Sequence, residues 1–189
     1  TKRVTESVRE LASELTALGY TAKDSLALAA DAAAIGFKGQ ELIEVTRKAT
    51  EMAALGMMTQ GEALNTVVSL NSAFGVSVEN LGGSLDYLNA VENETILSLQ
   101  DMSEAIPITA TAIQGLGGDV QDLAVFLTVM REGGINANEG ANALKTSLAR
   151  LISPTRQAQQ TAESFGISLH QIVSSNEGDL MGMIMELSG

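Results

Sequence analysis

The sequence of 189 residues predicts an all-α protein, either a multi-helix bundle or an irregular α-solenoid of short helical hairpins separated by glycine turns. Two observations support this prediction. Apolar residues recur at three- and four-residue spacing along most of the chain, which places them on one face of a helix. Glycines interrupt this pattern at intervals of 17, 20 and 19 residues, at Gly19, Gly36, Gly56 and Gly75. Since glycine readily ends a helix, each interval corresponds to one helix and its turn.

The front of the chain is expected to contain five helices. Thr21 with Asp24, and Thr59 with Glu62, have the spacing of a capping box at a helix start. The second helix is almost pure alanine and leucine, so it is expected to be buried between neighbours. The expected ranges are residues 3–18, 26–35, 40–55, 63–74 and, capped by Ser77, a fifth ending near residue 91. The inward positions are Val4, Val8, Leu11, Leu15 and Leu18 in the first helix, and Leu42, Val45, Ala49, Met52 and Ala53 in the third.

The regular spacing breaks at residues 92–95, where no glycine supplies a stop and the charge density rises. The predicted organisation is a front helical half over residues 1–92, a hinge or loop over 93–97, and a back helical half over 98–189. Both halves are expected to form one continuous domain cut from a much longer chain.

The back half begins with a helix start at Ser98 and Asp101. Pro107 removes a backbone donor and clashes with the preceding turn, so a kink or two short helices are expected, over residues 99–106 and 107–114. Asp119 is predicted to cap a helix over residues 120–132.

The most specific pattern of helix start and stop residues lies in residues 133–167. After Gly133, Gly134 and Ile135, Asn136 is expected to cap a helix with Glu139 three residues on. Ser153 is interpreted as a new N-cap with Pro154 at the first helical position, and Gly166 as the end of that helix. The inward positions of the first of these helices are Ala141, Leu144, Leu148, Leu151 and Ile152. A last, methionine-rich helix is expected over residues 180–187, starting at Asp179.

This stretch resembles the conserved core region of phage tail tape measure proteins. The matching letters are Gly133, Gly134, Ile135, Glu139, Gly140, Ala141, Ala143, Leu144, Leu148, Leu151, Ser153, Pro154, Thr155, Gly166, Ile167 and Ser168. The resemblance covers most of the chain, and its specificity is concentrated in these residues. It implies a structural segment that helps to set tail length and to template tail tube assembly, and that leaves the tail ahead of the DNA.

The resemblance also implies partners and a location. The partners are other copies of the chain, in a three- or six-fold homo-oligomer, together with tail tube proteins and baseplate hub or distal tail proteins. The location is the virion, in the tail lumen or tail tip, and the host cytoplasm during assembly. A soluble helical adaptor or regulatory interaction module is the alternative interpretation, and a wall-degrading enzyme segment is a third.

The composition excludes several classes of function. The net charge of −12 disfavours contact with a phosphate backbone, so no specific nucleic-acid binding is expected. The chain has no cysteine, which excludes disulfides and thiolate zinc sites. The apolar run over residues 26–37 is short and contains Asp31, so no membrane segment is expected in this piece.

No arrangement of residues predicts catalysis, and no catalytic, cofactor-binding or metal-ligating residue is proposed; no cofactor is expected. His170 is the only histidine and is interpreted as a surface residue. The glycines of residues 115–118 lack the strand and the lysine of a phosphate loop, so they are interpreted as a helix end. The carboxylate pairs are interpreted as helix starts or as a solvated loop: Glu41 with Glu44, Glu92 with Glu94, and Asp119 with Asp122.

Methionines supply the candidate interface residues, because they are adaptable packing groups at positions with no evident core role. They are Met57, Met58, Met181, Met183 and Met185. Core filling is the alternative interpretation. If the three late methionines were all buried within one chain, the docking hypothesis would fail.

Overall fold

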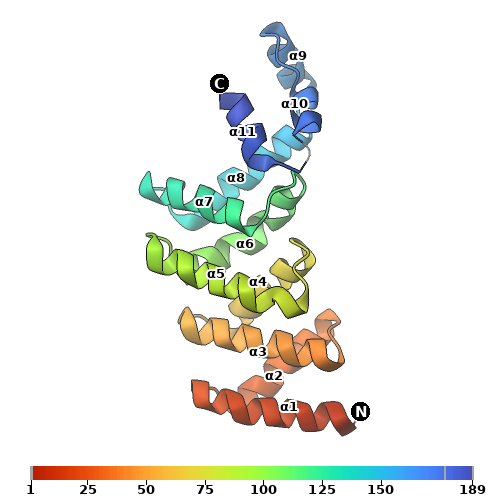
Figure 1. Cartoon of the computed structure of the whole chain (residues 1–189), viewed down its shortest axis with the longest axis vertical. Coiled ribbons are helices and arrows are strands. Elements are labelled where there is room, and N and C mark those ends of the chain that lie inside the picture. The colour runs from red at the N-terminus through yellow and green to blue at the C-terminus, as the bar shows by residue number, and fades with distance from the viewer. Residues whose placement is uncertain (1, 177, 189) are drawn as a thin grey trace. The chain divides into compact units, whose positions relative to one another are not determined.

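The computed structural model describes residues 2–176 and 178–188, and all of their regular secondary structure is helical (Figure 1). The all-α prediction is therefore confirmed. The α-helices are α1 (Lys2–Leu15), α2 (Ala22–Ile35), α3 (Gly39–Leu55), α4 (Gln60–Ser72), α5 (Leu81–Glu94), α6 (Leu99–Gln114), α7 (Val120–Glu132), α8 (Ala137–Ile152), α9 (Arg156–Ser164), α10 (Leu169–Ser175) and α11 (Leu180–Ser188). Two 3₁₀ turns, η1 (Thr16–Leu18) and η2 (Val78–Asn80), precede α2 and α5.

The chain forms two compact units, residues 1–104 and residues 105–189, whose boundary falls within α6. The predicted halves, with a hinge at residues 93–97, remain a prediction. The connection from α5 to α6 is short and hydrogen-bonded: the Leu99 amide donates to the Glu92 carboxylate (2.8 Å) and the Leu97 amide to the Thr95 hydroxyl (3.1 Å). Glu92 thus belongs to α5 and holds the start of α6, and its assignment to a solvated loop was wrong.

The first unit stacks helical hairpins. Helix α1 packs on α2 and α3, α2 packs on α3 and α4, and α3 packs on α4 and α5. Contacts between each helix and the next two along the chain are the pattern of a solenoid, so this unit follows the irregular α-solenoid alternative of the prediction. The predicted inward positions of α3 are all buried, and Leu11 and Leu15 of α1 meet Ala29 and Ile43 in one core cluster. The side chains of Val4 and Val8 lie outside those described.

Helix α2 is buried on one face only. Leu28, Ala29 and Ala32 face the core, whereas Leu26 and Ile35 are exposed. The expectation that this alanine-rich helix is buried between neighbours was therefore wrong for its outer face.

Side-chain caps begin most helices where the sequence predicts them. Capping boxes form at Thr21 with Asp24, at Thr59 with Glu62, and at Asp119 with Asp122. The Ser77 prediction was wrong, because η2 intervenes and the Ser77 side chain makes no cap hydrogen bond. Local caps thus account for the helix starts except where a tighter turn precedes the helix.

The four evenly spaced glycines serve two different purposes. Gly19, Gly36 and Gly75 have positive φ angles of 88°, 127° and 70°, which glycine adopts readily in the turns that follow helices. Gly56 instead has φ −85°, and the next residue, Met57, takes the left-handed conformation with φ 49°. A Cβ at position 56 would meet the Met58 side chain and would lie 3.2 Å from Leu99 Cδ2. A side chain at position 56 would therefore displace the end of the Met58 side chain and crowd Leu99, while the left-handed conformation falls on a methionine.

Helix α6 runs through Pro107 as one element, so the alternative of two short helices was wrong and that of a kink stays a prediction. Pro107 has no N–H to donate to the carbonyl of Ser103, four residues before it. The buried hydroxyl of Thr66 in α4 lies 3.1 Å from that oxygen and also 3.1 Å from the Glu62 carbonyl of its own helix, so its one proton is shared between two acceptors. A tertiary contact thus replaces part of the bond that proline removes.

Candidate functional site

The first half of the stretch at residues 133–167 adopts the predicted geometry. Gly134 has φ 86°, and the Ile135 amide donates to the Met130 carbonyl (2.9 Å), which closes the end of α7. The Asn136 side chain then accepts from the Glu139 amide (2.8 Å) and caps α8. A Cβ at Gly140 would lie 2.9 Å from Met130 Sδ, so this glycine allows α7 and α8 to pack closely.

The second half of the stretch differs from the prediction at its proline. Ser153 ends α8, its amide bonded to the Ala149 carbonyl, and Thr155 caps α9 by accepting from the Ala158 amide (3.2 Å). The assignment of Ser153 as N-cap and Pro154 as first helical residue was wrong. Pro154 precedes the cap, where its fixed φ keeps the connector extended between two helices. Gly166 has φ 77° and ends α9 as predicted.

Helices α8 and α9 are equally well capped but differ in burial. Ala141, Leu144 and Leu148 of α8 are buried, as predicted, whereas Leu151 is half-buried and Ile152 exposed. Helix α9 has no buried residue. Phe165, directly after it, is 77% exposed, a feature that the sequence interpretation missed.

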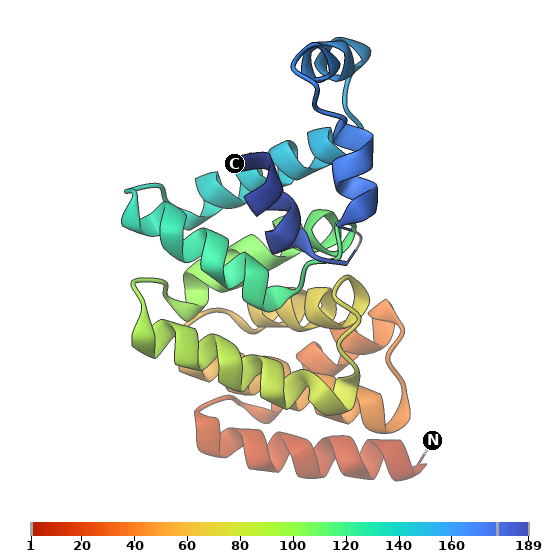
Figure 2. The ribbon, with the colours of Figure 1, turned by 45° about the horizontal axis from the view of Figure 1, so that its top comes forward.

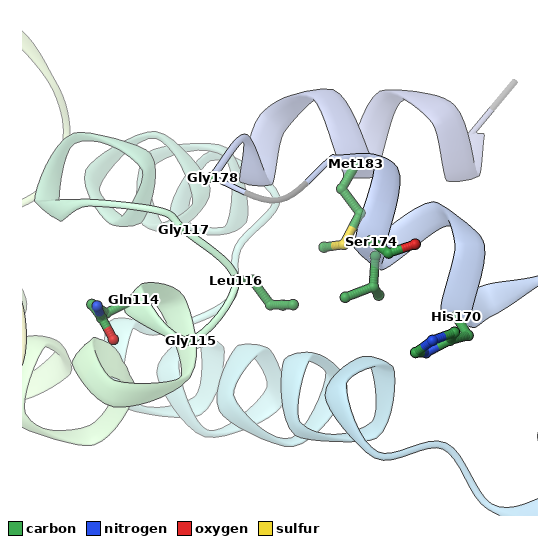
Figure 3. Close-up of a pocket in the computed structure, with 9 residues that line it drawn as sticks. Gln114, Gly115, Leu116, Gly117, His170, Ser174, Gly178 and Met183 are labelled. Carbon is green, nitrogen blue, oxygen red and sulfur yellow. The ribbon is translucent and has the colours of Figure 1, made fainter.

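A pocket of about 450 Å³ lies in the second unit, between the turn that follows α6 and the helices α10 and α11 (Figure 3). Its apolar wall comes from Leu116, Val173 and Met183, and its polar groups from Gln114, His170 and Ser174. The remaining lining residues are glycines: Gly115, Gly117 and Gly178. No carboxylate stands among the described residues that line the pocket, so these residues do not supply the acid and base pair of a glycosidase.

The glycine-rich turn at residues 115–118 receives the segment that leads into α11. A Cβ at Gly117 would collide with the backbone of Gly178, and one at Gly118 would lie 2.6 Å from Leu180 Cδ2. The sequence interpretation as a helix end is confirmed for Gly117, which has φ 78°. The close backbone approach to Gly178 depends on a contact that local sequence does not show.

Carboxylates gather beside this turn. Partial burial raises the pKa of Asp122, and the negative charges of Asp119 and Asp179 act in the same direction, against a lowering by the Asp119 amide. Within the described residues, no group of three or more His, Cys, Asp or Glu side chains is arranged to hold a metal ion. Asp119 and Asp122 serve as the capping box of α7, in agreement with their interpretation as helix-start residues.

The candidate interface methionines divide into two groups. Met57 is 92% exposed and Met185 is 70% exposed, and Met181 is half-buried. Met58 and Met183 are buried, so the expectation that they lack a core role was wrong. Because the late methionines are not all buried, the docking hypothesis stands as a proposal for Met57, Met181 and Met185.

A second pocket, of about 430 Å³, lies in the first unit where the start of α3 meets η2 and α5. It is lined by Gln40, Glu41, Glu44, Lys48, Val78, Glu79 and Gly82. Glu44 pairs with Arg47 (2.6 Å) and Lys48 pairs with Glu51 (2.7 Å). Neither the Glu41 nor the Glu79 side chain has an ion pair or a hydrogen bond within the described part of the chain. The pair Glu41 and Glu44 was noted in the sequence, but the approach of Glu79 was not.

None of the described helices is long and apolar enough to cross a bilayer.

No solved structure matches the chain. The sequence is 21% identical over 151 residues to a tape measure protein of Pneumococcus phage Dp-1, an alignment that covers 80% of this chain and 13% of that protein. It is 24% identical over 116 residues to a probable tape measure protein of Escherichia phage P2, covering 61% of this chain and 14% of that protein.

The chain thus spans only a small part of the length of these relatives. The sequence profile described as Phage-related minor tail protein matches residues 6–189, which is nearly the whole chain. With the capped, glycine-punctuated helices found at residues 133–152, this match confirms the tape measure resemblance: the chain belongs to the phage-related minor tail protein family.

Proposed function

We propose that this chain is a structural, non-enzymatic segment of a tail tape measure protein, which helps to set tail length and to template assembly of the tail tube. The observation that carries the proposal is the family match over residues 6–189. The capped helices along the described chain support a structural role.

Several copies, in three- or six-fold arrangement, lie in the tail lumen or tail tip and leave ahead of the DNA. Tail tube proteins and baseplate hub or distal tail proteins are the other partners, and the host cytoplasm is the place of assembly. Met57 and Met185 are the exposed apolar groups for such contacts.

Labelling in the virion tests the location. The chain has no cysteine, so Ala30→Cys at an exposed position of α2, introduced into the full-length phage protein, creates a single thiol in this segment. A thiol-reactive gold label applied to opened tails is expected inside the tail and is expected to leave with DNA release. The buried Ala32→Cys is the matched control and should not react. Label on the outer virion surface, or label retained in emptied tails, would overturn the proposal.

Deletion tests the role in tail length. Removing residues 1–104 in frame from the full-length gene is expected to give shortened tails or no tails, measured by electron microscopy of lysates. Tails of unchanged length would contradict the proposal.

A further inference from the structure

Helix α9 stands apart from the other helices of its unit. Figure 2 shows it joined to α8 and α10 by two extended connectors. It has nine residues, none buried, and Phe165 and Ile167 at its end are exposed. An isolated helix of this length is only marginally stable in water, and burying an exposed aromatic ring is energetically favourable. The segment of residues 153–168, termed the arm below, therefore has the properties of an element that docks on a partner.

The charge of the stretch that leads from α8 into the arm indicates the partner. Residues 140–162 contain Lys145 and Arg150 of α8 and Arg156 of the arm but no Asp or Glu, in a chain whose net charge is −12; Glu163 follows directly after this stretch. All three cations are exposed, and none has an ion pair within the described residues. Two copies of so acidic a chain repel each other unless a cationic segment of one meets an anionic surface of the other.

The first unit supplies the complementary surface. Residues 1–104 carry 15 Asp and Glu against 7 Lys and Arg. In its pocket of about 430 Å³, Glu41 and Glu79 have no cationic partner in the described chain. Lys48, which also lines this pocket, is paired with Glu51, so the two carboxylates leave the site negatively charged. Such a site attracts a guanidinium, which binds carboxylates through paired N–H donors.

We propose that the arm of one copy, together with the adjoining end of α8, docks on the first unit of a second copy, with Arg150 or Arg156 at the pocket of Glu41 and Glu79 and Phe165 buried in the contact. The proposal rests on the proposed presence of several copies in one tail. Because donor and acceptor surfaces differ, the contact is heterologous and joins copies head to tail, which gives a ring when the rotation closes.

Complementary charge reversal tests this contact in the 189-residue chain. The arm variant carries Arg150→Glu, at the end of α8, and Arg156→Glu, and the pocket variant carries Glu41→Arg and Glu79→Arg. Sedimentation velocity should show concentration-dependent association of the wild type that weakens about tenfold or more between roughly 50 and 500 mM salt. Each variant alone should lose association, and a chain with all four changes should regain it. Lys23→Glu, an exposed cation of α2 outside the arm, is the matched control and should leave association unchanged.

The outcomes separate the alternatives. A monomeric wild type at all concentrations, association that neither variant weakens, or failure of the fourfold variant to regain it would each overturn the docking proposal. Circular dichroism checks that these exposed changes leave the helices intact. Salt-sensitive binding of a DNA duplex, lost in the arm variant while the chain stays monomeric, would assign the cations to nucleic acid instead. The location measured by labelling in the virion does not depend on any of these results, so either proposal can fail without the other.

Discussion

Helices α3 and α9 differ in how much they contribute to the fold, although both have clear ends in the sequence. Helix α3 carries apolar residues at regular spacing and buries eight side chains, whereas α9 reads Arg-Gln-Ala-Gln-Gln-Thr-Ala-Glu-Ser and buries none. Thr155 caps α9 with a side-chain hydrogen bond, while the start of α3 has no side-chain cap. Caps and glycines decide where a helix begins and ends, but apolar periodicity decides whether it joins the core.

The largest expected effect is near the C-terminal end of α3. Met52→Ala removes a buried side chain, and we expect a loss of about 2–5 kcal/mol in the free energy of unfolding. Phe165→Ala at the end of α9 is the matched change, and we expect less than about 0.5 kcal/mol in a monomeric sample because the ring is exposed. Urea unfolding followed by circular dichroism measures both. Equal losses would contradict the contrast between the two helices.

The bond between Thr66 and Ser103 should rank next. Thr66→Val leaves the Ser103 carbonyl buried without its donor, and we expect a loss of about 1–3 kcal/mol. Thr46→Val in α3 is the control, because its hydroxyl donates to a carbonyl of its own helix that already has a backbone donor, and it should cost less.

A double-mutant cycle isolates this bond. Pro107→Ala restores the missing N–H of α6, so Thr66→Val should cost clearly less in the Pro107→Ala background than in the wild type. Identical costs in both backgrounds would show that the hydroxyl does not replace the proline's missing donor.

The turns that end α3 and α9 should respond differently to a methyl group. Gly56→Ala introduces a clash with Met58 and Leu99, and we expect a loss of about 1–3 kcal/mol. A Cβ at Gly166 meets no atom, so Gly166→Ala should cost only about 1–2 kcal/mol of backbone strain, confined to the arm.

Met57→Gly should relieve strain at φ 49° and raise stability by about 0.5–1 kcal/mol. Thermal unfolding measures all three, and destabilisation by Met57→Gly would show that its side chain packs within the monomer.

The smallest expected effects concern the capping carboxylates of the two units. Hydrogen bonds from the Thr59 backbone and side chain lower the pKa of Glu62 in the folded protein. The ionised Glu62 therefore stabilises the fold at neutral pH, and this stabilisation is lost as the pH falls through the lowered pKa. Burial first, and then the charges of Asp119 and Asp179, raise the pKa of Asp122 above 3.8 in the folded protein. The protonated Asp122 therefore stabilises the fold at low pH, and this stabilisation is lost as the pH rises through the raised pKa.

Neutral variants of these two residues should therefore change the free energy of unfolding in opposite directions. At pH 7, Glu62→Gln should destabilise the protein and Asp122→Asn should stabilise it, and both differences should shrink as the pH falls toward 3. Unfolding curves at several pH values measure the differences. The same sign for both variants at neutral pH would contradict the assignment for Asp122.

Local sequence correctly predicted the features that depend on neighbours three or four residues away. The caps at Thr21, Thr59, Asp119 and Asn136 are of this kind, as is the buried face of α3. Such contacts form within one turn of helix, so the residues that make them are visible together in the sequence. Ser77 and Ser153 were misread because hydroxyl residues stand beside both helices and turns, and the backbone path decides which one they serve.

The sequence alone therefore determined the fold class, most helix ends and the family of this protein, because these depend on periodicity and local hydrogen bonds. Tertiary structure decided what depends on distant partners. Thr66 bonds to the Ser103 carbonyl of α6, Met58 and Leu99 crowd position 56, and Gly178 lies against Gly117. It also decided that Met58 is core and that Phe165 is surface, since burial is set by which elements pack around a residue rather than by its type.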